Sequence, residues 1–242
     1  MIDLPGSYRI GPSGRVLNKK QFFPKTLPAT ARTRLRKILR RVVLTHQIAG
    51  DSIPSLIDDN YKCAVILCLD IDLEDIRHVR FAAQALQPLF KSFARIRFSD
   101  PSGRTALSFA HKRLNRNDPG TVTVEDAYLT AVSAAPDAFA ACRFDRLLNR
   151  TNKRDLYLEA MLRAYLADHP KLFQNAGKLW DSKIWYHGDT ILRTFRALRE
   201  LETLRDAKTK APTQAEKAAL NKKIRHTIEF LQALPATSPV KS

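Results

Sequence analysis

The sequence predicts an α+β fold, in which a small mixed β-sheet with packed helices is followed by a helical region that ends in a long antiparallel helical hairpin. Three observations predict it. A β-branched apolar run and two alternating segments occupy the centre of the chain, helical spacing dominates beyond about residue 126, and a capping box precedes a final heptad-like segment. The 242 residues, 44% of them hydrophobic, are typical of a globular chain.

We expect two regions, a basic arm, helix and sheet over residues 1–125 and a helical region over residues 126–242. Whether they form one domain or two is open, because residues 126–150 lack the composition of a flexible linker. The longest apolar run, residues 64–69, is too short to cross a bilayer, and the N-terminal residues lack the pattern of a signal peptide. These features predict a cytoplasmic, bacterial-type protein without membrane contact.

Charge is the most informative property of the chain. The 41 Lys and Arg residues exceed the 24 Asp and Glu residues, which gives a net charge of +17. The excess lies at the two ends, because residues 1–60 carry 11 basic and 4 acidic groups and residues 131–242 carry 20 and 12. Such a balance predicts polyanionic partners, and the alternative is a basic surface that only keeps the chain in solution.

The N-terminal segment contains two extended pieces around the turn Gly11–Gly14. This turn is not a phosphate loop, since no Gly-Lys-Ser/Thr follows it. Downstream, the basic residues Lys19, Lys20 and Lys25 are interleaved with the aromatic residues Phe22 and Phe23. The mixture predicts either stacking on nucleic-acid bases or a tail that packs on the body.

The clearest helical pattern covers residues 30–46. Its apolar positions follow the i, i+3, i+4, i+7, i+8 spacing of a core-facing stripe: Leu35, Ile38, Leu39, Val42 and Val43. Its opposite arc is cationic: Arg34, Arg36, Lys37, Arg40 and Arg41. Like charges four residues apart on a helix repel each other, so an acidic partner explains this arc, and a solvated surface is the alternative.

The central elements are predicted as a strand over residues 61–73, a helix over residues 74–90, and strands over residues 93–98 and 104–111 that form a hairpin. The turn lies at Asp100–Gly103, and residues 121–124 form one more extended piece. Farther on, helices are predicted over residues 155–168, from Asp189 or Thr190 to about Lys208, and after the capping box of Thr213 and Glu216. The last two helices form the hairpin.

Signals for enzymatic chemistry are weak. Asp70 and Asp72 share one face of a strand and suggest a divalent-metal-dependent nuclease, but the following strand lacks the expected acid-x-Lys pattern, because Ala110 lies two residues before Lys112. The three cysteines and six histidines have no metal-ligand spacing. No cofactor and no metal are therefore expected.

One short segment carries a resemblance to a known family. Ala110-His111-Lys112-Arg113, at the end of a strand, resembles a signature of a bacterial family of uncharacterised domains whose genes lie beside superfamily-two helicases and adenine-specific DNA methyltransferases in restriction and anti-phage islands. The similarity continues in order through the segments Val16–Lys19, Pro24–Lys25 and Asp155–Tyr157 and through Asn221. It implies a biological context and no catalytic residue.

The sequence and the resemblance together predict a non-enzymatic, nucleic-acid-binding accessory subunit of a restriction or anti-phage defence system that docks on a helicase or methyltransferase. Its expected phosphate contacts are Lys19, Lys20, Lys25, Arg34, Arg36, Lys37, Arg40, Arg41, Lys112 and Arg113. DNA and RNA are not distinguished, although DNA fits the context. The alternatives are a protein-only adaptor that binds acidic surfaces, and the metal-dependent nuclease that uses Asp70 and Asp72.

Overall fold

The computed structural model describes residues 8–10, 14–18, 23, 27–134, 137–173 and 176–234. A six-stranded sheet with the order β1-β2-β5-β6-β7-β8 forms its centre. The strands are β1 (Arg15–Val16), β2 (Leu39–Ile48), β5 (Ile66–Leu73), β6 (Phe93–Ser99), β7 (Thr105–Asn115) and β8 (Asp118–Leu129). Because β5 and β6 are parallel and the other neighbours are antiparallel, the sheet is mixed, as predicted.

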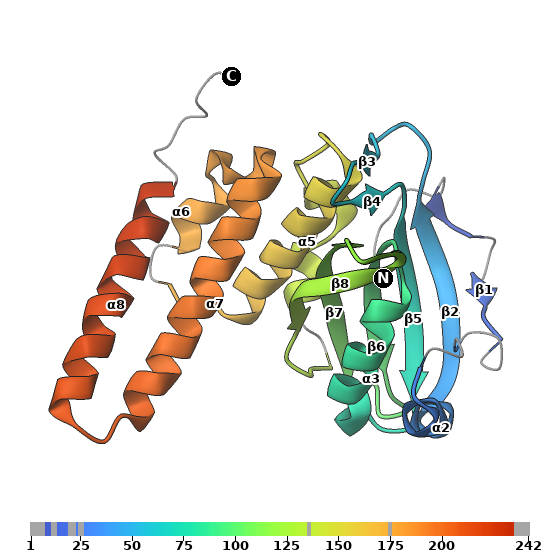
Figure 1. Cartoon of the computed structure of the whole chain (residues 1–242), viewed down its shortest axis with the longest axis horizontal. Coiled ribbons are helices and arrows are strands. Elements are labelled where there is room, and N and C mark those ends of the chain that lie inside the picture. The colour runs from blue at the N-terminus through green and yellow to red at the C-terminus, as the bar shows by residue number, and fades with distance from the viewer. Residues whose placement is uncertain are drawn as a thin grey trace.

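Helices flank the sheet and dominate the C-terminal half (Figure 1). They are α2 (Ala29–Ile38), α3 (Val79–Leu86), α4 (Asp137–Ala141), α5 (Lys153–Asp168), α6 (Ala176–Trp180), α7 (Gly188–Lys210) and α8 (Gln214–Ala233). A separate pair of short strands, β3 (Leu56–Ile57) and β4 (Lys62–Cys63), precedes β5. Figure 1 shows the α7–α8 hairpin extending away from the sheet beyond β8. None of the helices within the described ranges has the length and apolar character that a membrane crossing requires.

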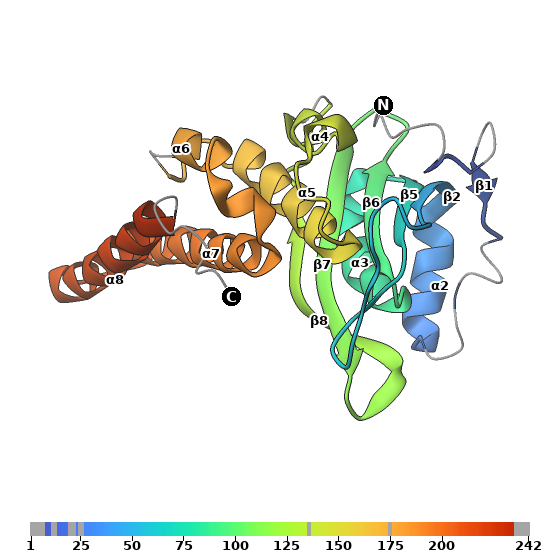
Figure 2. The ribbon, with the colours of Figure 1, turned by 90° about the horizontal axis from the view of Figure 1, so that it is seen from above.

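The sheet has a hydrophobic core on each face, because side chains alternate along a strand. On one face α2 and α3 pack against residues such as Leu69, Ile71 and Phe98. On the other face α5 and α7 pack against residues such as Ile66 and Phe109. Figure 2 shows α5 and α2 on opposite sides of the strands. The second core includes residues from both sides of position 126, and the predicted division there stays a prediction.

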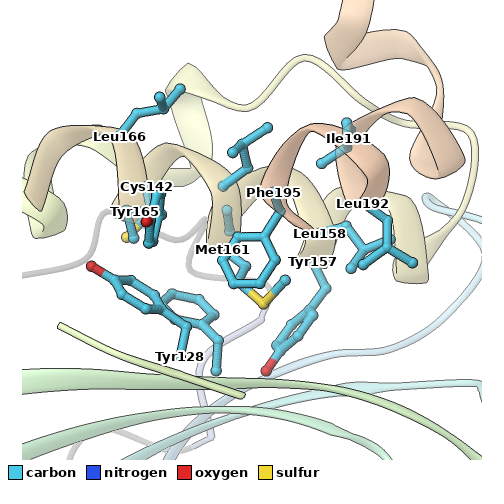
Figure 3. Close-up of a cluster of buried hydrophobic side chains, with 14 of the residues drawn as sticks. Tyr128, Cys142, Tyr157, Leu158, Met161, Tyr165, Leu166, Ile191, Leu192 and Phe195 are labelled. Carbon is cyan, nitrogen blue, oxygen red and sulfur yellow. The ribbon is translucent and has the colours of Figure 1, made fainter. Parts of the chain in front are cut away.

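Helix α5 lies between the sheet and α7, and Figure 3 shows its side chains meeting those of both. It is buried almost all round, including charged residues. Lys153 donates to the carbonyl oxygens of Gly50 and Ile53, and the Glu159 carboxylate accepts the backbone N–H groups of Leu148 and Asn149. Buried charges need such partners, so α5 also holds two neighbouring loops in place.

The helix predicted over residues 30–46 is only partly correct. α2 ends at Ile38, and β2 begins at Leu39 and pairs with both β1 and β5. The apolar positions fit the helical period, and they also fit the strand period, because a bulge lies between Leu39 and Arg41 in the pairing with β5. Val42 and Val43 are β-branched and favour the strand, and two neighbouring strands satisfy its backbone.

Other predicted elements are confirmed with shifted ends. β8 is longer than the predicted extended piece, and α3 is shorter than the predicted helix. The turn at Asp100–Gly103 closes with a hydrogen bond from Gly103 N to Asp100 O, and Gly103 has a φ of 80° that suits glycine. The capping box of Thr213 and Glu216 is formed at the start of α8. The α+β fold and the helical C-terminal half are thus confirmed.

Candidate functional site

Four of the predicted phosphate contacts are exposed residues close together in sequence, where α2 ends and β2 begins. Arg36 and Lys37 occupy the last turn of α2, and Arg40 and Arg41 open β2. All four side chains are exposed, and none forms an ion pair with a carboxylate in the described part of the chain. We call these four residues the α2–β2 strip.

The helix dipole accounts for the position of only two of these four cations. A cation in the last turn of a helix is stabilised by the partial negative charge there, which applies to Arg36 and Lys37. Arg40 and Arg41 lie on a strand and gain nothing from it. Arg41 is paired in register with Asp72, but the Asp72 carboxylate accepts a hydrogen bond of 2.8 Å from the Ser99 hydroxyl instead.

The other predicted cations of the N-terminal half differ in their placement. Arg34 lies on the neighbouring helix, with its guanidinium carbon 4.0 Å from the centre of the Phe81 ring. This cation–π contact holds α2 against α3 and leaves the side chain exposed. Lys19, Lys20 and Lys25 lie outside the described residues.

Strands β6 and β7 separate near the signature segment. Their pairing runs from Ser99 and Thr105 to Ile96 and Ser108. Two steps farther in that register, Ala94 would pair with Ala110. Between them the Tyr157 hydroxyl accepts the N–H of Ala110 at 2.8 Å and donates to the carbonyl oxygen of Ala94 at 2.9 Å.

Lys112 fills the same gap one step farther along. Its Nζ donates to the carbonyl oxygens of Phe90, at 3.1 Å, and Ser92, at 3.2 Å, and the residue is 2% exposed. Burial lowers the pKa of Lys112 to about 7. The expectation that Lys112 contacts phosphate is therefore incorrect, because its nitrogen points into the protein and links two diverging segments. We remove it from the proposed interface.

Its neighbour His111 faces two carboxylates of β8. His111 is completely buried, and its Nδ1 lies 3.3 Å from Glu125 Oε2 and 3.6 Å from Asp126 Oδ2. Neither ring nitrogen has a partner at hydrogen-bond geometry among the described residues. We call His111, Glu125 and Asp126 the β7–β8 cluster.

A β-bulge makes this cluster possible. His111 is paired with Asp126, and Lys112 is paired with Val124, so Glu125 is an extra residue of β8. Consecutive strand residues normally point to opposite faces, but a bulge redirects one of them. Here Glu125 and Asp126 both reach the same imidazole.

Two arginines surround the carboxylates of the cluster. Arg113 Nε donates to Glu125 Oε1 at 2.6 Å, and Arg196 of α7 donates to Asp126 Oδ2 at 2.7 Å. Burial alone would raise the pKa of Asp126, but the contacts with His111 and Arg196 hold it at about 2. Arg113, a predicted phosphate contact, is thus already paired with a carboxylate.

The comparisons with known proteins identify the family of the chain. Residues 2–229 match the family described as "Domain of unknown function (DUF4391)". The chain belongs to this family. The match confirms the predicted membership of a family of uncharacterised domains, whereas the gene neighbourhood with helicases and methyltransferases stays a prediction. No curated protein and no solved structure gives a significant match.

The carboxylates that the nuclease hypothesis uses are engaged within the sheet of this family member. Asp70 Oδ2 lies 3.4 Å from the Arg97 guanidinium, and Asp72 is bound by Ser99, each on the neighbouring strand β6. Burial raises the pKa of Asp70. In the described ranges, the β7–β8 cluster is the one group of three or more His, Cys, Asp or Glu residues with metal-ligand separations, and it excludes both. We therefore do not carry the nuclease hypothesis further.

A second basic surface lies between α7 and α8, near β8. A groove of about 810 Å³ is lined there by four Lys and Arg residues and His226, with Glu200 as its one acidic residue and with Ala197, Thr227 and Phe230: the cations are Arg193, Arg196, Lys222 and Lys223. In the same region Arg199 Nη1 donates to the Ala127 carbonyl oxygen of β8 at 2.7 Å. Neither this groove nor the β7–β8 cluster is predictable from the sequence, because both depend on how α7 and β8 are placed. The heptad-like spacing of the last helix indicates a helical hairpin but not which of its faces is cationic.

Proposed function

We propose that this protein binds nucleic acid through the phosphate backbone, as a non-enzymatic accessory subunit of a bacterial restriction or anti-phage defence system. The observation that carries the proposal is the α2–β2 strip, four exposed cations without an ion-pair partner in the described chain. Backbone phosphates supply closely spaced negative charges, and each contact with Lys or Arg releases a condensed counterion. The net charge of +17 supports the same class of partner.

Binding through phosphates predicts little sequence selectivity. No groove-reading motif is recognised in the sequence, and phosphate contacts carry orientation but no direct base information. The α7–α8 groove adds a second cationic surface. A helicase or DNA methyltransferase is the proposed docking partner, and this part of the proposal rests on the family resemblance of the Ala110–Arg113 segment.

Fluorescence anisotropy with labelled duplex DNA and with an RNA duplex of the same length tests the proposal. The decisive variant is R36Q/K37Q/R40Q/R41Q. Neutral glutamine is preferable to glutamate, because a carboxylate at position 41 would face Asp72 across the sheet. The matched control, K171Q/K178Q/K183Q/K210Q, removes the same charge from four exposed lysines elsewhere. Circular dichroism checks that both variants fold.

With four phosphate contacts the wild-type affinity falls roughly a hundredfold between 50 and 200 mM salt. We expect the strip variant to lose on the order of a hundredfold in affinity at 50 mM salt, and the control to retain most of it. Equal losses of affinity in the two variants would show a general effect of net charge and would reject the α2–β2 strip as the binding surface. No binding by wild-type protein even at 50 mM salt would leave the protein-only adaptor as the better explanation.

The docking part needs a separate experiment. Tagged protein is recovered from its native host with and without nuclease treatment, and the bound proteins are identified. A helicase or methyltransferase that remains after nuclease treatment supports direct docking. If such a protein disappears with the nucleic acid, or never appears, the proposed docking is wrong.

A further inference from the structure

We propose that the β7–β8 cluster binds a divalent transition-metal ion through His111 Nδ1 and the carboxylates of Glu125 and Asp126. The three ligand atoms all lie within 4.8 Å of one another. None of the three ligands belongs to the α2–β2 strip, so metal binding can be tested separately from nucleic-acid binding by the strip.

The separations suit a metal ion. A tetrahedral ion with ligand bonds of about 2.0–2.1 Å holds its ligands roughly 3.3–3.4 Å apart. Nδ1 of His111 lies 3.3 Å from Glu125 Oε2 and 3.6 Å from Asp126 Oδ2.

The histidine supplies the second, independent observation. Its ring is completely buried, yet neither nitrogen has a partner at hydrogen-bond geometry in the described chain. A buried polar atom without a partner costs free energy, and a metal ion bound to Nδ1 would use its lone pair. The carboxylates are partly exposed, with 28% and 18% of their side chains accessible, so an ion can enter from their side.

The ligand set indicates the class of ion. An imidazole nitrogen with two carboxylate oxygens suits Zn²⁺ and Mn²⁺, whereas Mg²⁺ and Ca²⁺ prefer oxygen ligands alone. Three protein ligands leave a coordination position for water. Arg113 binds the far oxygen of Glu125, Oε1, and can stay there as an outer partner that orients the carboxylate.

Arg196 has a different relation to the cluster. Its Nη2 lies 2.7 Å from Asp126 Oδ2 and 3.5 Å from Glu125 Oε2, which is where a cation shared by both carboxylates would be held. The side chain is 49% exposed and can withdraw into solvent. Arg196 therefore competes with the ion, and its removal strengthens metal binding.

Isothermal titration calorimetry on the full chain, with tags removed and metals stripped by a chelator, tests the proposal. Zn²⁺, Mn²⁺ and Mg²⁺ are titrated separately into wild type, E125Q, E125Q/D126N, R196Q and H169A. H169A is the matched control, because His169 Nε2 lies 3.2 Å from the Glu202 carboxylate but belongs to no three-ligand group among the described residues. Circular dichroism establishes that each variant is folded.

We expect one equivalent of Zn²⁺ or Mn²⁺ and much weaker binding of Mg²⁺. E125Q should weaken binding by more than the roughly 10- to 100-fold that is typical for loss of an outer-shell partner. R196Q should tighten it and H169A should leave it unchanged. If E125Q/D126N is unfolded, metal binding by the folded single variant E125Q decides whether the carboxylates are ligands. No binding by wild type, or binding that E125Q leaves intact, overturns the proposal.

Discussion

The side-chain nitrogen of Lys112 lies 3.1 Å from the carbonyl oxygen of Phe90, in the gap that opens between β6 and β7. Tyr157 bridges the same gap one step earlier, through Ala94 and Ala110. Two polar side chains thus replace the backbone pairing that the separating strands lose. The signature segment Ala110–Arg113 lies at this separation and at the bulge that forms the β7–β8 cluster.

The first prediction concerns the pH dependence of stability. The pKa of Lys112 falls from 10.5 to about 7 on folding. Between these values the unfolded chain binds more protons than the folded one, so this residue makes the free energy of unfolding rise with pH, at most by about 1.4 kcal/mol per pH unit. We expect wild type to gain stability relative to Lys112→Met as the pH rises from 7.5 to 9.5.

Urea denaturation across that pH range measures the difference. Lys62→Met provides the control, because Lys62 is exposed and its substitution should give a curve parallel to that of wild type. If the free energy of unfolding changed with pH in the same way for wild type and K112M, this result would contradict the burial of the Lys112 amine.

The second prediction concerns the bridge at Tyr157. Tyr157→Phe leaves the Ala110 N–H without its partner, whereas the Ala94 carbonyl keeps a hydrogen bond from Gln87 Nε2. One buried unsatisfied donor costs about 1–3 kcal/mol, which we expect as the loss in the free energy of unfolding. The same substitution at Tyr186, which is 53% exposed, should change stability little. Equal effects at both positions would argue against the bridge.

The third prediction concerns a close approach at the start of α7. A Cβ added to Gly188 would collide with the carboxylate of Asp155, whereas one added to Gly177 would meet open space. Gly188→Ala should therefore lower the free energy of unfolding by about 1–3 kcal/mol. Gly177→Ala should be neutral or slightly stabilising, because alanine restricts the unfolded chain. Thermal and urea denaturation measure the stability of both variants. If G188A were as stable as wild type, the start of α7 could not lie so close to Asp155 of α5.

The fourth prediction separates paired from unpaired arginines in nucleic-acid binding. Each phosphate contact contributes about 0.9 to the slope of log affinity against log salt. Arg40→Gln should reduce the magnitude of the slope by about that amount. Arg113→Gln should leave it unchanged, because Arg113 is bound to Glu125. A larger change in the slope for R113Q than for R40Q would indicate that nucleic acid contacts the β7–β8 hairpin and not α2 and β2.

The fold was largely predictable, because long periodic segments and caps are local signals. The capping box at Thr213 is an example, since it needs only four residues of sequence. The end of α2 was not predictable from periodicity, because Leu39, Val42 and Val43 fit a helix and a bulged strand equally well. Pairing with β5, which is a nonlocal interaction, decided between them.

The candidate sites were predictable in part. Exposure of Arg36 and Lys37 follows from their position opposite Leu35 and Ile38 on a short amphipathic helix. The burial of Lys112 does not follow from its neighbours, because it results from the separation of two strands. The cluster around His111 depends on a bulge that shifts the register by one residue, and a pattern of period two cannot reveal such a shift.

The contacts that α7 makes with β8 also affect how copies of this protein meet. β8 is the outer strand on its side of the sheet, and Arg199 occupies a main-chain acceptor of Ala127 there. On the opposite border the described part of β1 pairs over only two residues. A free strand from another molecule therefore finds an occupied acceptor at Ala127 on one border and only two paired residues in the described part of the other, and both features disfavour edge-to-edge association at these places.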